Sequence, residues 1–179
     1  MLILGASGGV GTIAVQLAKA YGARVTGVCS TSKMDLVRAI GADEVIDYTH
    51  DDFTKSDARY DLIIDTGGSR PLIQIRRVLT RRGTLVIVGG ENGGRWFGGF
   101  IGRTLRAMVL SAGRPQKLGM LASVESTEVL DGLRDLIESR GITPVVDRTY
   151  PLRDTAAAIQ DLRAGRAQGK LVITNEQPQ

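Results

Sequence analysis

The sequence is poor in the residues that build disulfides, metal sites and aromatic stacking surfaces. It contains one cysteine, one histidine and one tryptophan among 179 residues, and aromatic residues make up 4% of the chain. A single cysteine excludes a disulfide framework within the chain and is typical of a reducing cytosol. Cys29 and His50 cannot form a zinc site between them, because zinc sites use three or four protein ligands. We therefore predict a cytoplasmic protein and no metal site.

Long apolar runs and a secretory signal are also missing. No stretch is long and apolar enough to span a membrane, and Met1 leads directly into a short apolar segment. The net charge is +4, and the densest basic cluster contains Arg76, Arg77, Arg81 and Arg82. No aromatic residues interleave with these arginines as stacking platforms, so a solvated helix end is favoured over nucleic-acid binding. We expect neither a membrane nor a nucleic acid as partner.

The first eleven residues, MLILGASGGVG, organise the rest of the chain. Residues 1–4 are an apolar run typical of a strand, residues 5–11 are rich in glycine, and an apolar stripe with helical spacing follows. This is the context of a dinucleotide-binding turn, because glycines let the backbone approach a pyrophosphate and the helix N-terminus points N–H groups at it. A tight turn without a ligand has the same outline. We interpret the segment as a cofactor-binding turn in which Gly11 lets the helix pack close to the strand.

Strand and helix signals alternate along the chain that follows. The strand runs are continuously apolar, as expected of strands covered on both faces. Their alternation with helices predicts an α/β fold, a doubly wound parallel sheet of about six strands in the order 3-2-1-4-5-6, the Rossmann fold. The predicted strands are residues 1–4, 24–28, 44–46, 61–65, 84–88 and 106–110.

Helices are predicted between these strands and after the last of them. Ser32, with Asp35 three residues later, is typical of a capping box, and Pro71 fits the first turn of a helix. A long amphipathic helix is expected from Ser126 or Thr127 to a glycine at position 141. Its apolar residues are predicted to face inward: Val129, Leu130, Leu133, Leu136 and Ile137.

The chain is predicted to divide into a Rossmann domain, residues 1–141, and a C-terminal tail, residues 142–179. Within the tail, residues 143–150 contain a proline and are typical of an edge strand or an extended arm. A helix is expected over residues 154–164, and a last strand over residues 171–174.

The end of the second strand predicts which nicotinamide cofactor binds. NAD sites place a carboxylate about 20 residues after the glycine turn, where it accepts a hydrogen bond from the ribose 2′-hydroxyl. Here the sequence reads Cys29-Ser30-Thr31-Ser32-Lys33, which offers hydroxyls and a cation but no carboxylate. This combination favours the 2′-phosphate of NADP(H), although a helix cap followed by a solvated lysine has the same pattern.

Two further turns follow the fourth and fifth strands, at the sheet edge where ligands bind in open α/β sheets. These turns are predicted to face the nicotinamide half of the cofactor, unless they only end their strands. The residues predicted to bind the cofactor are Gly5, Ala6, Ser7, Gly8, Gly9, Val10, Gly11, Cys29, Ser30, Thr31, Lys33, Asp65, Thr66, Gly67, Val88, Gly89 and Gly90.

Taken together, these motifs resemble the medium-chain dehydrogenase/reductase superfamily. GASGGVG, CSTSK, GADEVIDY, DTGG, VIVGG, ITPVVDRTYPL and GKLVI occur in that family's order and spacing, and are most similar to its zinc-free quinone oxidoreductase branch. The resemblance implies a six-stranded Rossmann domain, NADPH as hydride donor, and a quinone, enone or related carbonyl as acceptor. It also implies that Ser30, Lys33 and Tyr48 lie beside the 2′-phosphate, so Tyr48 joins the predicted site.

Members of this family carry a partly open barrel domain before the Rossmann domain, and the tail from residue 142 resembles the part that returns to it. Because this chain begins within the first Rossmann strand, we expect full catalysis to need more than these residues, and we predict no catalytic residue among them. Two alternatives stay open. One is a non-catalytic nucleotide-binding module, and the other is the cofactor domain of a zinc-type alcohol dehydrogenase.

Self-association is predicted at the edge of the sheet. The resemblance suggests that the sixth strand, predicted from Arg106 to Leu110, pairs with its twin across a two-fold axis. Met108 and Val109 are apolar, and an open apolar edge tends to pair with another chain. A homodimer is therefore expected. The alternative is a monomer whose edge is covered by residues 91–102.

Overall fold

The computed structural model describes residues 1–68, 70–88, 100–111, 113, 115–120 and 126–175. Most of these residues form a six-stranded parallel sheet with its helices, and the last of them form a two-stranded parallel sheet. The larger sheet has the order β3-β2-β1-β4-β5-β6, which confirms the predicted doubly wound topology. Its strands are β1 (Leu2–Leu4), β2 (Thr26–Cys29), β3 (Glu44–Asp47), β4 (Tyr60–Asp65), β5 (Leu79–Ile87) and β6 (Lys117–Met120).

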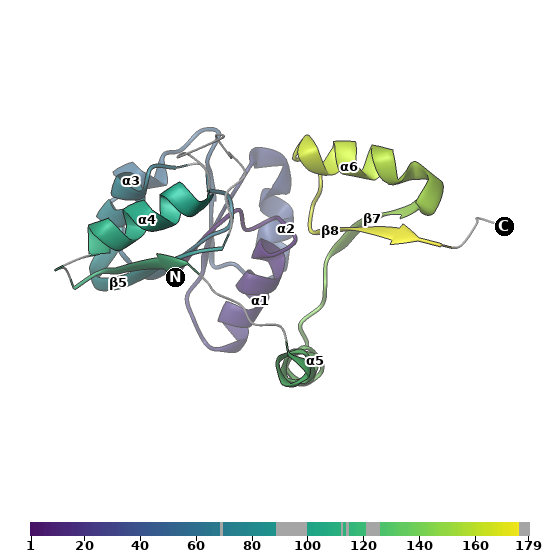
Figure 1. Ribbon diagram of the computed structural model, residues 1–179, viewed down its shortest axis with the longest axis horizontal. Coiled ribbons are helices and arrows are strands. Elements are labelled where there is room, and N and C mark those ends of the chain that lie inside the picture. Colours follow the sequence, from purple (N-terminus) through teal and green to yellow (C-terminus); the bar gives the residue numbers. More distant parts are fainter. Residues whose placement is uncertain (69, 89–99, 112, 114, 121–125, 176–179) are drawn as a thin grey trace.

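Helices cover both faces of this sheet (Figure 1). The first two helices lie on one side and the next two on the other, as expected when the strand order reverses direction at the middle of the sheet. Short 3-10 turns occur at Thr31–Lys33, Phe53–Lys55 and Leu152–Asp154. The helices up to the sixth strand are α1 (Gly11–Ala20), α2 (Met34–Ala39), α3 (Leu72–Arg77) and α4 (Phe100–Ser111).

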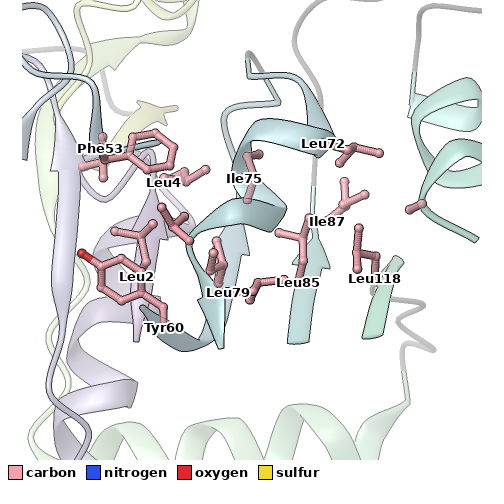
Figure 2. Packing of buried hydrophobic residues seen from close by; sticks show 14 residues of the cluster. Leu2, Leu4, Phe53, Tyr60, Leu72, Ile75, Leu79, Leu85, Ile87 and Leu118 are labelled. Carbon is pink, nitrogen blue, oxygen red and sulfur yellow. The ribbon is translucent and has the colours of Figure 1, made fainter. Parts of the chain in front are cut away.

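Two apolar clusters hold the layers together, one on each face of the sheet. Leu2 and Leu4 belong to one cluster and Ile3 to the other, because successive strand residues point to opposite faces. Figure 2 shows the larger cluster, in which Leu72 and Ile75 of α3 pack toward strand residues. All five side chains are buried. The continuously apolar strands that the sequence contains are therefore covered on both sides, as predicted.

The predicted sixth strand is wrong. Residues 106–110 lie in helix α4, where Ala107 is buried, Leu110 is half-buried and Val109 is 75% exposed, a helical rather than an alternating pattern. The sixth strand is instead Lys117–Met120, which pairs with β5. Ser111 ties the two elements together, since the amide of Leu118 donates to its Oγ at 2.7 Å.

Helix α5 (Thr127–Arg140) has the predicted ends but not the predicted environment. Ser126 caps its first turn, where its Oγ accepts a hydrogen bond from the amide of Val129, and Gly141 ends it in the left-handed conformation with φ of 65°. None of the residues of α5 is buried, and Val129 and Leu130 are 56% and 62% exposed. The prediction that its apolar stripe faces inward is therefore wrong for this structure.

The predicted capping box is also wrong. Residues 31–33 form a 3-10 turn, and α2 begins only at Met34, with Lys33 at its N-cap and no side-chain cap. Asp35 pairs with Arg38 one turn later, at 3.0 Å, instead of reaching back to Ser32. This shift places Lys33 at the junction of the turn and the helix. Gly89, Gly90 and residues 91–99 of the predicted loop lie outside the described residues.

The end of the chain forms a small unit beside α1 and α2 (Figure 1), which we call the C-terminal unit. It consists of β7 (Val146–Pro151), α6 (Thr155–Arg163) and β8 (Lys170–Thr174), close to the strand, helix and strand predicted for the tail. Gln16 of α1 joins the segment leading into it, because its side chain both donates to the carbonyl and accepts from the amide of Thr143, at 2.9 and 2.8 Å.

Candidate functional site: a cleft at the carboxyl ends of the strands

A cleft of about 470 Å³ lies at the carboxyl ends of β1, β2 and β4. The C-terminal unit forms its opposite wall through residues between α6 and β8. This is the position where ligands bind in open α/β sheets. Of the residues predicted from the sequence, the cleft is lined by Gly5, Ser7, Gly8, Gly9, Val10, Cys29, Ser30, Lys33, Tyr48, Thr66 and Gly67.

The glycine turn divides into structural and lining positions. Gly5 has φ of 77°, a conformation that favours glycine, and its amide donates to the carbonyl of Val28 at 3.1 Å. Gly11 starts α1, and a Cβ on it would lie 2.1 Å from the carbonyl oxygen of Gly5. Gly8 and Gly9 have no such backbone constraint and line the cleft. Gly5 and Gly11 therefore shape the turn, while Gly8 and Gly9 line the cleft.

The sequence predicts the adenosine half of the cofactor at the part of the cleft where β2 ends, which we call the adenosine end. Cys29, Ser30, Lys33 and Tyr48 line it, and Tyr48 is 53% exposed. Thr31 was predicted to join them, but its hydroxyl donates to the carboxylate of Asp47 instead. Hydrogen bonds from Thr31 and Thr49 hold the pKa of the Asp47 carboxyl below its usual range. Among the described residues, no Asp or Glu lines the cleft.

Lys33 is held in place by the C-terminal unit. Its Nζ donates to the carbonyl oxygens of Gly165 and Ala167, at 2.6 and 2.7 Å. The two partners lie 132 and 134 residues away along the chain, so no local sequence pattern could have indicated these contacts. They fix a cation at the adenosine end of the cleft.

The segment before β8 crosses the glycine turn. The amide of Gly169 donates to the carbonyl of Ser7 at 2.9 Å, and Gly169 forms a parallel bridge with Gly8. The side chain of Lys170 lies against Gly9, since a Cβ on Gly9 would be 2.9 Å from Lys170 Cδ and 3.2 Å from its Nζ. A second cation therefore lies next to the turn, and no sequence pattern indicates it because only the fold brings residue 170 to residue 9.

Of the three residues predicted to bind the cofactor at the end of β4, two line the cleft. Thr66 and Gly67 line the cleft, and the Thr66 hydroxyl donates to the carbonyl of Leu4 at 2.7 Å. Asp65 is 1% exposed, and its carboxylate accepts from the amide of Gly68 at 2.9 Å. Val88 donates its amide to the carbonyl of Asp65 at 2.9 Å and does not line the cleft. Asp65 and Val88 thus shape the turns.

Ala6, another predicted residue, is fully buried behind the turn and does not line the cleft.

Several residues that line the cleft were not predicted from the sequence. Phe53 is a buried member of the larger apolar cluster, and Arg70 lies 3.8 Å from the carboxylate of Asp52. No local pattern indicates either residue, because Phe53 lies in the polar connection between β3 and β4, and Arg70 follows the turn after β4. The other unpredicted lining residues are Leu4, Val28, Leu162, Gly165, Ala167 and Gly169.

Cys29 is expected to resist alkylation in the folded protein. It is 2% exposed, and burial, together with the nearby charge of Asp47, raises the pKa of its thiol to about 11. At pH 8 only about 0.1% of such a thiol is in the reactive thiolate form. Iodoacetamide should label the native chain far more slowly than the denatured chain. Native labelling at the rate of a free cysteine would contradict this environment.

The described residues contain no group of three or more His, Cys, Asp or Glu side chains that could hold a metal ion. His50 is exposed, with Nε2 4.0 Å from the Asp47 carboxylate. Among the helices of these residues, none has the length and apolar character that a membrane crossing requires.

Comparison with known proteins relates the chain to oxidoreductases. Residues 40–173 match a family model described as zinc-binding dehydrogenase. The chain is 37% identical to the mitochondrial NAD(P)H oxidoreductase RTN4IP1 of Mus musculus, over 96% of this chain and 47% of that protein. It is 32% identical to the 2-methylene-furan-3-one reductase of Solanum lycopersicum, over 97% of this chain and 39% of that protein.

Solved structures give the same relationship. The quinone oxidoreductase of Coxiella burnetii superposes with a TM-score of 0.82 at 26% identity, over 98% of this chain and 52% of that one. The chain therefore spans about half the length of the relatives it matches.

Proposed function

The chain belongs to the zinc-binding dehydrogenase family of the medium-chain dehydrogenase/reductase superfamily, and from this membership we propose that it is the NADPH-binding part of a reductase. A nicotinamide cofactor follows from its relatives, which include an NAD(P)H oxidoreductase. The proposed acceptor is a quinone, an enone or a related carbonyl. This is supported by the similarity to a quinone oxidoreductase and to a 2-methylene-furan-3-one reductase, whose named compound contains an enone.

The choice of NADPH over NADH rests on the adenosine end of the cleft. Ser30 and Tyr48 offer hydroxyls there, and Lys33 offers an ammonium group whose position is fixed by two carbonyls. The carboxylate of Asp47, at the end of the next strand, is occupied by Thr31 and Thr49 and does not line the cleft. A dianionic 2′-phosphate suits hydroxyls and a cation, whereas the 2′-hydroxyl of NADH would lack its usual acceptor.

The glycine turn fits the pyrophosphate. Gly8 has no side chain to fill the space above the turn, and the side chain of Lys170 lies against Gly9. The N-terminus of α1 follows directly, and the positive end of the helix dipole suits an anion. Two negative phosphates would thus lie between a helix N-terminus and a lysine.

The bound nicotinamide supplies the hydride, so this chain's residues act by binding and orienting. Thr66 and Gly67 line the cleft beyond the glycine turn and are proposed to position the nicotinamide end. None of the described residues is assigned as acid or base. The reaction is therefore proposed to depend on the alignment of donor and acceptor rather than on a proton relay within these residues.

Titration of the 179-residue chain with NADPH and NADH tests the cofactor assignment. Calorimetry should give a dissociation constant for NADPH at least about tenfold below that for NADH, because one charge-assisted contact contributes about 1.5–3 kcal/mol. Equal dissociation constants, or tighter binding of NADH than of NADPH, would overturn the assignment of NADPH.

Turnover is tested separately, by the loss of NADPH absorbance in the presence of a quinone or an enone. Tight NADPH binding without any turnover favours the non-catalytic module for this segment.

Self-association is proposed through β6, the terminal strand of the larger sheet, and not through residues 106–110, which are helical. Met120 at its end is 43% exposed, and Val109 on the adjoining α4 is also exposed. A terminal strand next to exposed apolar side chains tends to pair with another chain. Light scattering should therefore show a dimer, and Val109→Lys, which places a charge beside this strand, should weaken it. A strict monomer at high concentration would contradict the proposal.

A further inference from the structure

The turn between α6 and β8, residues 165–168, connects the C-terminal unit to the adenosine end of the cleft. The carbonyl oxygens of Gly165 and Ala167 both accept hydrogen bonds from Lys33. An ammonium group has three N–H donors, so two bonds to fixed carbonyls leave a third that can donate to a phosphate oxygen. The position of the Lys33 charge therefore depends on the position of this turn.

Arg166 lies between the two residues whose carbonyls accept from Lys33, and it is held by Asp161. The carboxylate of Asp161 accepts from Nε of Arg166 at 3.0 Å and also from its terminal nitrogen. The amide of Arg166 donates to the carbonyl of Asp161 at 3.1 Å. Both the side chain and the backbone of Arg166 are thus fixed by one residue of α6.

Asp161 is itself anchored to β7. Its carboxylate accepts from Arg148 Nη1 at 2.7 Å and from the Tyr150 hydroxyl at 2.5 Å. The Asp161 side chain is 16% exposed, and bonds from Tyr150 and Arg166 hold the pKa of its carboxyl below its usual range. A charged, largely covered carboxylate therefore joins the strand, the helix and the turn.

We propose that Asp161 is a positioning residue for cofactor choice, which holds the 165–168 turn so that its carbonyls keep the Lys33 ammonium beside the 2′-phosphate. This rests on the proposed preference for NADPH. Asp161 does not touch the cofactor in this scheme. Its effect passes through Arg166, the two carbonyls and Lys33, and concerns only the phosphate that distinguishes NADPH from NADH.

Asp161→Asn separates positioning from simple electrostatics, because the two predict opposite changes. Removal of a negative charge near the cleft would by itself strengthen the binding of an anionic cofactor. Loss of positioning instead raises the NADPH dissociation constant by about fivefold and leaves that for NADH unchanged. Asp154→Asn is the matched control, since Asp154 is exposed in the same unit and its side chain caps no helix.

Calorimetry with both cofactors gives the preference of each variant for NADPH, which is the ratio of the NADH dissociation constant to the NADPH dissociation constant. Hydrogen exchange of residues 164–170 shows whether the turn has become more mobile. If Asp161→Asn unfolds the C-terminal unit, Arg166→Gln removes the side-chain bonds between the turn and Asp161 while leaving the bonds from Arg148 and Tyr150. The preference of this variant for NADPH should fall by the same factor. When Lys33 is already replaced by methionine, neither Asp161→Asn nor Arg166→Gln should weaken NADPH binding further.

If the wild-type chain prefers NADPH and this preference is unchanged in both Asp161→Asn and Arg166→Gln, the proposed positioning role of Asp161 is overturned. A wild-type chain without that preference would instead refute the cofactor assignment itself. An equal loss for NADPH and NADH would show that Asp161 acts on the fold and not on the choice of cofactor.

Discussion

Replacing Gly8 by valine is expected to abolish NADP(H) binding while the chain stays folded. A Cβ at Gly8 would meet only the carbonyl oxygen of Gly5, at 3.4 Å, which is an ordinary contact, and φ at this position is not in the left-handed region. The fold therefore tolerates the first carbon. The two methyl groups beyond it would occupy the cleft above the turn, where the pyrophosphate is proposed to lie. We expect at least about a hundredfold loss of affinity, or about 2.7 kcal/mol.

Gly11→Ala is the informative comparison because it should fail in the opposite way. A Cβ there would lie 2.1 Å from the Gly5 carbonyl oxygen and 2.8 Å from backbone atoms of Ala6, so the start of α1 must move. Overpacking of this kind costs about 1–3 kcal/mol and lowers the melting temperature. Circular dichroism with calorimetric titration distinguishes the two variants. A folded Gly8→Val chain with normal affinity would show that the turn is structural only.

The alternation of strands and helices was sufficient to predict the sheet, because each apolar run must be buried on both faces by the helices beside it. Leu2 to Leu4 is fully apolar, and its side chains enter both clusters. The order of strands then follows from the short connections and the handedness of parallel crossovers. The same topology predicts that the carboxyl ends of the strands lie at one edge of the sheet, and most of the predicted binding residues do line one cleft there.

The sixth strand could not be predicted from its apolar content. Residues 106–110 are apolar enough for a strand, but their burial follows a helix with Ala107 inside and Val109 outside. The true strand, Lys117–Met120, contains a lysine and a glycine and is four residues long. It is specified by pairing with β5 and by the bond to Ser111, which are tertiary contacts.

The C-terminal wall of the site was hidden for a similar reason. Gly165, Ala167 and Gly169 carry no chemical signature, since they act through backbone atoms. For α5 the sequence predicted a contact that the structure does not contain, because its apolar stripe was expected to be buried and is not. Its helical spacing and both of its ends were predictable, whereas what the stripe faces is decided by packing, and Leu130 is exposed.

Lys33→Met should weaken NADPH binding by about tenfold to a hundredfold and leave NADH binding within about twofold. Methionine keeps most of the length of the side chain and removes the charge that is proposed to meet the 2′-phosphate. It also removes the bonds to Gly165 and Ala167, so hydrogen exchange of the 165–168 turn should increase in the cofactor-free chain. Parallel titrations with NADPH and NADH measure the first effect.

Lys170→Met is the matched control, because the side chain of Lys170 lies beside Gly9 of the glycine turn and not at the adenosine end. Both cofactors carry the pyrophosphate, so this change should weaken NADPH and NADH by the same factor. The two lysines thus make separable contributions, one to the choice of cofactor and one to its affinity. If Lys33→Met lowered both affinities equally, as expected for Lys170→Met, Lys33 would be a structural lysine and the preference for NADPH would need another origin.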